Sequence, residues 1–147
     1  MRVGVIGLAA TIVDKAMPRH FSAGVRLTDG IDEAREESQK LRNEGAELVV
    51  VLSHLGFPQD LKLAGEVPDV DVILSAHTHN RLDRPAVVGK TLVIQSGSHG
   101  SFIGRLDLTV KDGSVTDYRH ELIPVDDSFP EDPEVARLVR EALGDDS

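Results

Sequence analysis

Apolar residues along the chain fall into short continuous runs separated by stretches with helical spacing. The runs at 3–8, 47–53 and 71–76 are apolar on both faces, which is typical of strands buried inside a parallel sheet. The segments at 30–43 and 58–65 place their apolar residues on one stripe and predict helices. This order of strands and helices predicts an α/β protein with right-handed parallel crossovers.

The first helix carries signals at both of its ends. Asp29 is the predicted N-cap, and Gly45 has the left-handed preference that ends a helix. Residues 9–30 show no clear period, so we expect a long loop there, with a short strand at 25–27.

The C-terminal part of the chain has a different pattern. A short strand is predicted at 91–95, and the alternating segment 106–110 is joined by Asp112-Gly113 to a second strand at 114–125. We therefore expect an antiparallel hairpin extension. A last helix at 134–143 and a frayed acidic tail at 144–147 follow. The chain is interpreted as one domain, 1–147, with a core at 1–125 and a C-terminal helix and tail at 126–147.

Composition removes several classes of function. The net charge of −9 and an aromatic content of 3% argue against a nucleic-acid partner. The chain has no cysteine, so any metal must be held by histidine, carboxylate, amide or water. No apolar run reaches the roughly 18 residues of a membrane span, so we expect no membrane partner. The N-terminal apolar run is too short for a signal peptide. The chain as given would suit the cytoplasm, but its localisation stays unknown.

Three histidines follow predicted strands directly. His54 comes after the strand at 47–53, and His77 and His79 come after the strand at 71–76. Carboxyl ends of neighbouring parallel strands lie roughly 5 Å apart and form the usual binding edge of such a sheet. A lone histidine at a strand end is more often a hydrogen-bonded surface residue. The joint pattern nevertheless predicts His54, His77 and His79 as ligands of divalent metal ions such as Mn, Zn, Fe, Co or Ni.

The other histidines receive weaker predictions. His20 and His99 are expected to be polar loop residues that could touch a substrate, and His120 is expected to be structural. The segment Gly97-Ser98-His99-Gly100 could wrap closely around a site. It is no P-loop, because it lacks the Lys-Ser/Thr pair of that motif.

These motifs resemble those of the calcineurin-like metallophosphoesterases, most closely the 5′-nucleotidase and UDP-sugar hydrolase branch. The resemblance covers about 2–125 and rests on Val51-Leu-Ser-His54, Ser75-Ala-His-Thr-His79, the glycine-rich segment 93–104 and Leu106-Asp-Leu108. It implies a four-layer α/β/β/α sandwich. It also implies a two-metal site, with His54 and His77 on one ion and His79 on the other. Ala76 stands where the family usually has glycine.

The implied activity is hydrolysis of a phosphoric ester by a metal-activated water, with a phosphorylated small molecule such as a nucleotide as substrate. The family's Asp-x-His, Gly-Asp-x-x-Asp and Gly-Asn-His-Asp/Glu motifs do not occur in these 147 residues. We therefore expect a chain that matches the C-terminal half of the catalytic domain and is inactive alone. No catalytic residue is assigned, and Asp83 is a candidate fourth ligand.

Such a half-domain is expected to form a homo-oligomer or to associate with the missing N-terminal half. Three alternatives stay open at this point. The first is a non-catalytic metal-binding or oligomerising α/β domain, and the second is a plain α/β domain without metal. The third is the thiosulfohydrolase-like branch of the same superfamily. The substrate and the metal are not determined by the sequence.

Overall fold

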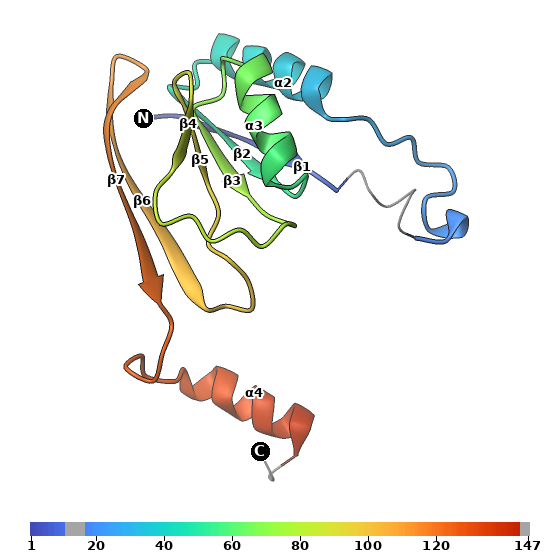
Figure 1. Cartoon of the computed structure of the whole chain (residues 1–147), viewed down its shortest axis with the longest axis vertical. Helices are drawn as coiled ribbons and strands as arrows, with labels where there is room; N and C mark the ends of the chain where they lie inside the picture. Colours follow the sequence, from blue (N-terminus) through green and yellow to red (C-terminus); the bar gives the residue numbers. More distant parts are fainter. Residues whose placement is uncertain (11–16, 145–147) are drawn as a thin grey trace.

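The computed structural model describes residues 1–10 and 17–144 and has the predicted α/β architecture (Figure 1). Its elements in chain order are β1 (Val3–Leu8), η1 (Arg19–Phe21), α2 (Ile31–Asn43), β2 (Leu48–Ser53), α3 (Phe57–Glu66), β3 (Val72–Ser75), β4 (Ala86–Val88), β5 (Thr91–Ile94), β6 (Phe102–Lys111), β7 (Ser114–Pro124) and α4 (Pro133–Leu143). The parallel β-α-β units followed by an antiparallel hairpin confirm the predicted fold class.

The main sheet has five strands in the order β1-β2-β3-β5-β4. The pairs β1–β2, β2–β3 and β3–β5 are parallel, and only β4 runs antiparallel, against β5. In register, Leu8 lies opposite Ser53 and Ser53 lies opposite Ser75, so the carboxyl ends of these strands share one edge. That edge is where the sequence pattern placed the site.

Helices α2 and α3 cover one face of the sheet and enclose the core. Stripe residues Ile31 and Ala34 of α2 and Leu63 and Ala64 of α3 are buried there against the strands. The strands contribute the buried side chains Ile6, Val49, Val51, Ile73 and Val93. This aliphatic core follows from the near absence of aromatic residues.

The hairpin β6–β7 lies against the opposite face. The face that is turned away from both helices carries the side chains of Leu48, Val72 and Leu92. These three side chains are buried. Gly104 of β6 lies very close to Ser96, because a Cβ added at Gly104 would come within 2.1 Å of the Ser96 hydroxyl oxygen. Farther from the hairpin the same face is open, and its exposed apolar side chains are Val3, Val5, Leu52 and Leu74.

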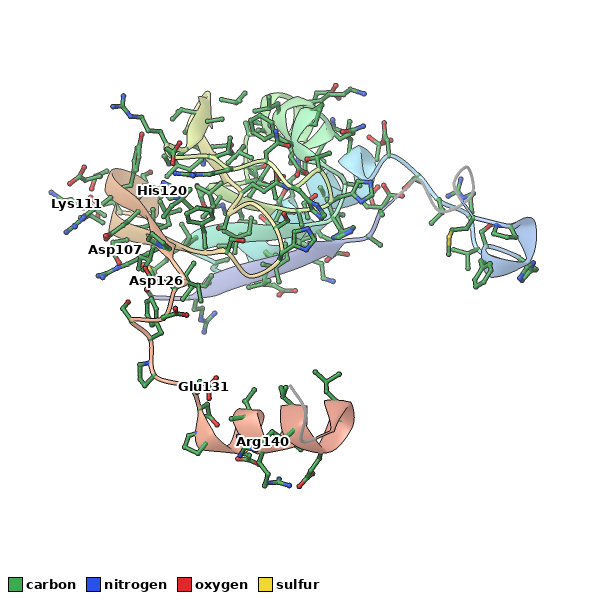
Figure 2. All side chains as sticks on the ribbon, turned by 60° about the horizontal axis from the view of Figure 1, so that its bottom comes forward. Asp107, Lys111, His120, Asp126, Glu131 and Arg140 are labelled. Atoms are coloured by element: carbon green, nitrogen blue, oxygen red, sulfur yellow. The ribbon has the colours of Figure 1, made fainter. Side chains whose placement is uncertain are left out.

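The C-terminal helix α4 stands apart from the sheet, as both views show (Figures 1 and 2). Asp107 and Lys111 mark the hairpin in Figure 2, and Glu131 and Arg140 mark the segment that leads away from it. Helix α4 has no buried residue, and its apolar stripe is exposed at Val135, Leu138, Val139 and Leu143. Its start is nevertheless well capped, since Asp132 accepts hydrogen bonds from the backbone N–H groups of the first turn.

A buried carboxylate, that of Asp71, lies at the end of the sheet opposite the histidines and connects several elements there. Asp71 is 2% exposed and forms an ion pair with Arg42 of α2. It also accepts hydrogen bonds from the Val49 backbone N–H at 2.8 Å and from the Lys90 ammonium at 3.1 Å. Asp71 thus links α2, β2 and the β4–β5 turn before β3 begins.

Some sequence predictions were wrong at the level of single elements. Residues 25–27 form no strand, and β4 was not predicted. The N-cap of α2 is Gly30, with φ 79°, and Asp29 instead accepts a hydrogen bond from the Ile31 N–H at 3.2 Å. The left-handed turn at position 30 suits glycine because it has no Cβ. Residues 145–147 of the predicted tail lie outside the described residues.

Across the described part of the chain, no helix has the length and apolarity that crossing a membrane requires.

Candidate metal site

His54 begins the loop between β2 and α3 at the common strand edge. Its backbone N–H donates to the Leu8 carbonyl of β1 at 2.9 Å, which continues the parallel pairing one residue beyond the strand. The next N–H, that of Leu55, donates to the Ser53 hydroxyl at 3.1 Å. The backbone at His54 is therefore fixed on both sides, while its imidazole is exposed.

The structure brings the imidazoles of His54 and His77 together. Their ring centroids are 5.1 Å apart and their planes are inclined by 59°. With metal–nitrogen bonds of about 2.1 Å, two imidazoles on one tetrahedral ion would have centroids roughly 5 Å apart. The separation of this pair fits a shared divalent ion, and histidine nitrogen suits Zn, Mn, Fe, Co or Ni.

His79 lies beside a different imidazole, that of His99. Their ring centroids are 5.9 Å apart, at an inclination of 67°. The sequence interpretation gave His99 only a weak role, as a polar loop residue. A signal for it existed, because His99 lies in a Gly-Ser-His-Gly segment after β5, the strand next to β3. Histidines thus follow three neighbouring strands, β2, β3 and β5.

The predicted ligands do not form one compact cluster. Among residues 1–10 and 17–144, no group of three or more His, Asp or Glu side chains is placed to hold an ion together. Asp83, the candidate fourth ligand, instead pairs with Arg81 at 3.0 Å. Any complete site therefore needs donors in addition to these pairs of imidazoles, and the ligand roles of His54, His77 and His79 stay predictions.

Backbone conformation marks the same residues. His77, His79 and His99 have positive φ angles of 75°, 57° and 58°. Asp112, in the Asp-Gly hairpin turn, is the only other non-glycine residue with positive φ in the described part of the chain. Left-handed backbone at a residue other than glycine is uncommon and is held by its surroundings, often at functional sites.

A buried carboxyl group lies beneath the strand ends that carry the histidines. Asp60 of α3 is completely buried and accepts a hydrogen bond from the Ser53 hydroxyl at 2.5 Å. Its second carboxyl oxygen has no hydrogen-bond partner among the described residues. Burial raises the pKa of the Asp60 carboxyl above its ordinary value of 3.8, and the Ser53 and Ser75 hydroxyls offset part of that rise. Asp60 thus joins the last residue of β2 to α3.

This raised pKa predicts a pH-dependent effect of Asp60→Asn. The folded state disfavours the ionised form of Asp60. The protonated Asp60 side chain therefore makes its full contribution to the free energy of unfolding below pH 3.8, and this contribution is lost as the pH rises through the pKa of Asp60 in the folded state. The variant cannot ionise at this position. Its stability relative to wild type is therefore expected to increase as pH rises above 3.8.

Urea denaturation of both proteins between about pH 3 and 7 measures this difference. Asp83→Asn, at an exposed ion pair with Arg81, is the matched control and should change the free energy of unfolding by less than about 1 kcal/mol. A stability difference between Asp60→Asn and wild type that stays constant across the range would contradict the prediction.

The remaining histidines lie away from this edge. His20 is in η1, against the Phe21 ring at a centroid distance of 4.5 Å, and η1 lies at the far end of the loop in Figure 1. His120 is on β7, opposite Leu106, and both of its ring nitrogens are buried without a hydrogen-bond partner among the described residues. Neither residue adds a donor to the histidine pairs.

Comparison with known proteins gives several relatives. The chain is 33% identical to an apyrase of Anopheles gambiae over an alignment of 161 positions, gaps included, which covers 92% of this chain and 28% of the apyrase. It is 33% identical to the uncharacterised metallophosphoesterase YunD of Bacillus subtilis over 93 residues, or 63% of this chain and 20% of YunD. The chain therefore spans less than a third of the length of these relatives. No family model matches it.

Solved structures show the same relationship. The sulfate thiohydrolase SoxB of Thermus thermophilus, solved with glycerol, superimposes with a TM-score of 0.91 at 32% identity, over 96% of this chain and 26% of SoxB. A 5′-nucleotidase precursor from Thermus thermophilus superimposes with a TM-score of 0.77 at 24% identity, over 95% of this chain and 31% of that chain. At this lower identity the second likeness concerns the fold alone.

Proposed function

Since this chain belongs to the 5′-nucleotidase branch of the calcineurin-like metallophosphoesterases, we propose that it carries part of a two-metal phosphoesterase site. The observation that supports this most directly is the His54–His77 pair, with ring centroids 5.1 Å apart at adjacent strand ends. His54 and His77 are proposed to bind one divalent ion, and His79 the other.

Two divalent ions in such a site activate a water molecule and neutralise the charge of the phosphoryl oxygens during in-line attack. The residues of this chain contribute binding and orientation. Uncharged imidazoles ligate through nitrogen and do not cancel the positive charge of the ions. His99 lies beside His79, and we propose that it contacts the substrate. We assign no residue of this chain to proton transfer at the leaving group.

A phosphorylated small molecule such as a nucleotide is the proposed substrate of the whole protein. This follows the relatives, which include an apyrase and, by fold, a 5′-nucleotidase precursor. A second candidate is thiohydrolase chemistry on a sulfur conjugate. The observation that favours it is the TM-score of 0.91 and the 32% identity to the sulfate thiohydrolase SoxB.

The remaining metal ligands are proposed to come from outside these 147 residues. The carboxylate and asparagine motifs of the family are absent from this sequence. The sheet face at Val3, Val5, Leu52 and Leu74 is exposed and apolar, so a second copy or a segment bearing those motifs could cover it. We therefore propose that the 147-residue chain alone is inactive or nearly so.

A hydrolysis assay on the 147-residue chain tests this function. With MnCl2 present, we expect bound metal by elemental analysis but turnover of bis-p-nitrophenyl phosphate or AMP far below about 1 s⁻¹, the lower end of usual enzyme rates. Bound metal would support the metal site. Enzyme-like turnover would overturn the proposed inactivity, and absence of metal binding would leave a plain α/β domain.

A further inference from the structure

Gln95 is a buried amide directly after β5, at the edge that carries the histidines. Its side chain is 3% exposed. Its side-chain oxygen, Oε1, accepts hydrogen bonds from the Asn80 backbone N–H at 2.8 Å and from the Thr78 hydroxyl at 3.4 Å. The side-chain nitrogen, Nε2, is buried without a hydrogen-bond partner among the described residues, so the two contacts at Oε1 are the hydrogen bonds by which this buried amide holds residues 78–80.

Thr78 extends this connection to the loop that follows β2. Its hydroxyl oxygen accepts a hydrogen bond from the Phe57 backbone N–H at 3.0 Å. The two loops also touch closely at Gly56, where an added Cβ would lie 2.9 Å from the Thr78 methyl carbon. A continuous chain of hydrogen bonds therefore runs from Gln95 through Thr78 to Phe57.

The segments joined in this way are the ones that carry the proposed ligands. Thr78 lies between His77 and His79, and Phe57 lies three residues after His54. Both His77 and His79 have left-handed backbone, a conformation that costs of the order of 1 kcal/mol or more and needs support from its surroundings. The residue after each of them, Thr78 and Asn80, is held by Gln95.

We propose that Gln95 is a positioning residue that holds the 77–80 turn against the 54–57 loop and so sets the spacing of the His77 and His54 imidazoles for one divalent ion. This inference rests on the proposed metal site. Gln95 touches neither imidazole through a hydrogen bond and acts only through Thr78 and Asn80. It therefore affects metal affinity by preorganising the ligands, as residues behind metal ligands do.

Gln95→Met tests the proposal, because it removes the amide acceptor while keeping the length of the side chain. Titration calorimetry of the 147-residue chain with MnCl2 should show affinity about 10- to 100-fold weaker than wild type, the usual range for such positions. Gln95→Glu retains an oxygen acceptor and should recover most of that affinity. Thr78→Val breaks the same chain of hydrogen bonds at a less buried residue and should weaken Mn²⁺ binding in the same direction.

Thr91→Val is the matched control. Thr91 lies at the opposite end of β5, is 1% exposed and donates from its hydroxyl to the Val70 carbonyl at 2.7 Å. Its replacement should lower the free energy of unfolding, measured by urea denaturation, without changing Mn²⁺ affinity. A purely structural Gln95 would behave in the same way as Thr91.

The outcomes separate the two hypotheses. Wild-type chain that binds no Mn²⁺ would overturn the proposed metal site and this inference together. Wild-type chain that binds Mn²⁺, with unchanged affinity in folded Gln95→Met, would overturn only the positioning role. If Gln95→Met fails to fold, Thr78→Val decides: unchanged Mn²⁺ affinity in that variant overturns the positioning role, and weaker affinity supports it.

Discussion

Replacing His54 with alanine is expected to weaken Mn²⁺ or Zn²⁺ binding by at least about tenfold while changing stability little. Removing a metal ligand should weaken metal binding at least as much as removing a residue that supports a ligand. Removal of a supporting residue lowers metal affinity by about 10- to 100-fold. The exposed imidazole has no hydrogen bond to the rest of the described chain, so its removal leaves the fold intact. Titration calorimetry gives the affinity, and urea denaturation gives the stability.

His20→Ala is the control for this experiment. His20 is also exposed and also lies against another ring, but in η1, away from the strand edge. It should leave metal affinity unchanged. Equal affinity of wild type and His54→Ala would contradict a metal role for His54.

A double-mutant cycle then tests the assignment of ligands to ions. If His54 and His77 hold one ion, removing the second imidazole should cost much less than removing the first, because the shared ion is already lost. His54→Ala combined with His79→Ala should instead give nearly additive losses, since His79 is assigned to the other ion. Additive losses for the His54 and His77 pair would show that these residues do not share an ion.

The strand edge could be predicted from the sequence because it depends on strong local patterns. Apolar runs at β2 and β3 and the helical stripe of α3 between them predict parallel neighbours, and His54 and His77 follow those runs directly. The structure confirms that β2 and β3 are adjacent and that the two imidazoles meet. For His54 and His77, the position in the sequence directly after a buried strand was enough to predict their position at the edge of the sheet.

The features that were missed depend on tertiary contacts. The three residues of β4 have no pattern of their own and become a strand by pairing with β5. His99 reaches His79 through a loop of several residues with left-handed turns, so spacing alone does not place it. The buried Asp60 and Gln95 are ordinary polar residues in the sequence, and their roles come from the hydroxyls and N–H groups that surround them.

Asp71 illustrates the same limit at the other end of the sheet. In the sequence it reads as the first residue of a strand, whereas in the structure it is the buried partner of Arg42 and Lys90. Removing one member of a buried ion pair leaves charges and donors without their partner. The cost is commonly about 3–5 kcal/mol, in contrast to below about 1 kcal/mol for exposed pairs.

Asp71→Ala is therefore expected to lower the free energy of unfolding by about 3 kcal/mol, measured by urea denaturation. The lower end of the range applies because Lys90 is half exposed and water can solvate it after the change. Asp107→Ala breaks an exposed pair with Arg105 on the hairpin and should lower the free energy of unfolding by less than about 1 kcal/mol.

If Asp71→Ala does not fold, Asp71→Asn takes its place. Its loss of stability should be smaller, because the amide oxygen still accepts a hydrogen bond from the Val49 backbone N–H. Asp71 and the histidines lie at opposite ends of β3, so folded variants of Asp71 should keep wild-type Mn²⁺ affinity. A loss of affinity equal to that of His54→Ala would show that the two ends of the sheet are coupled.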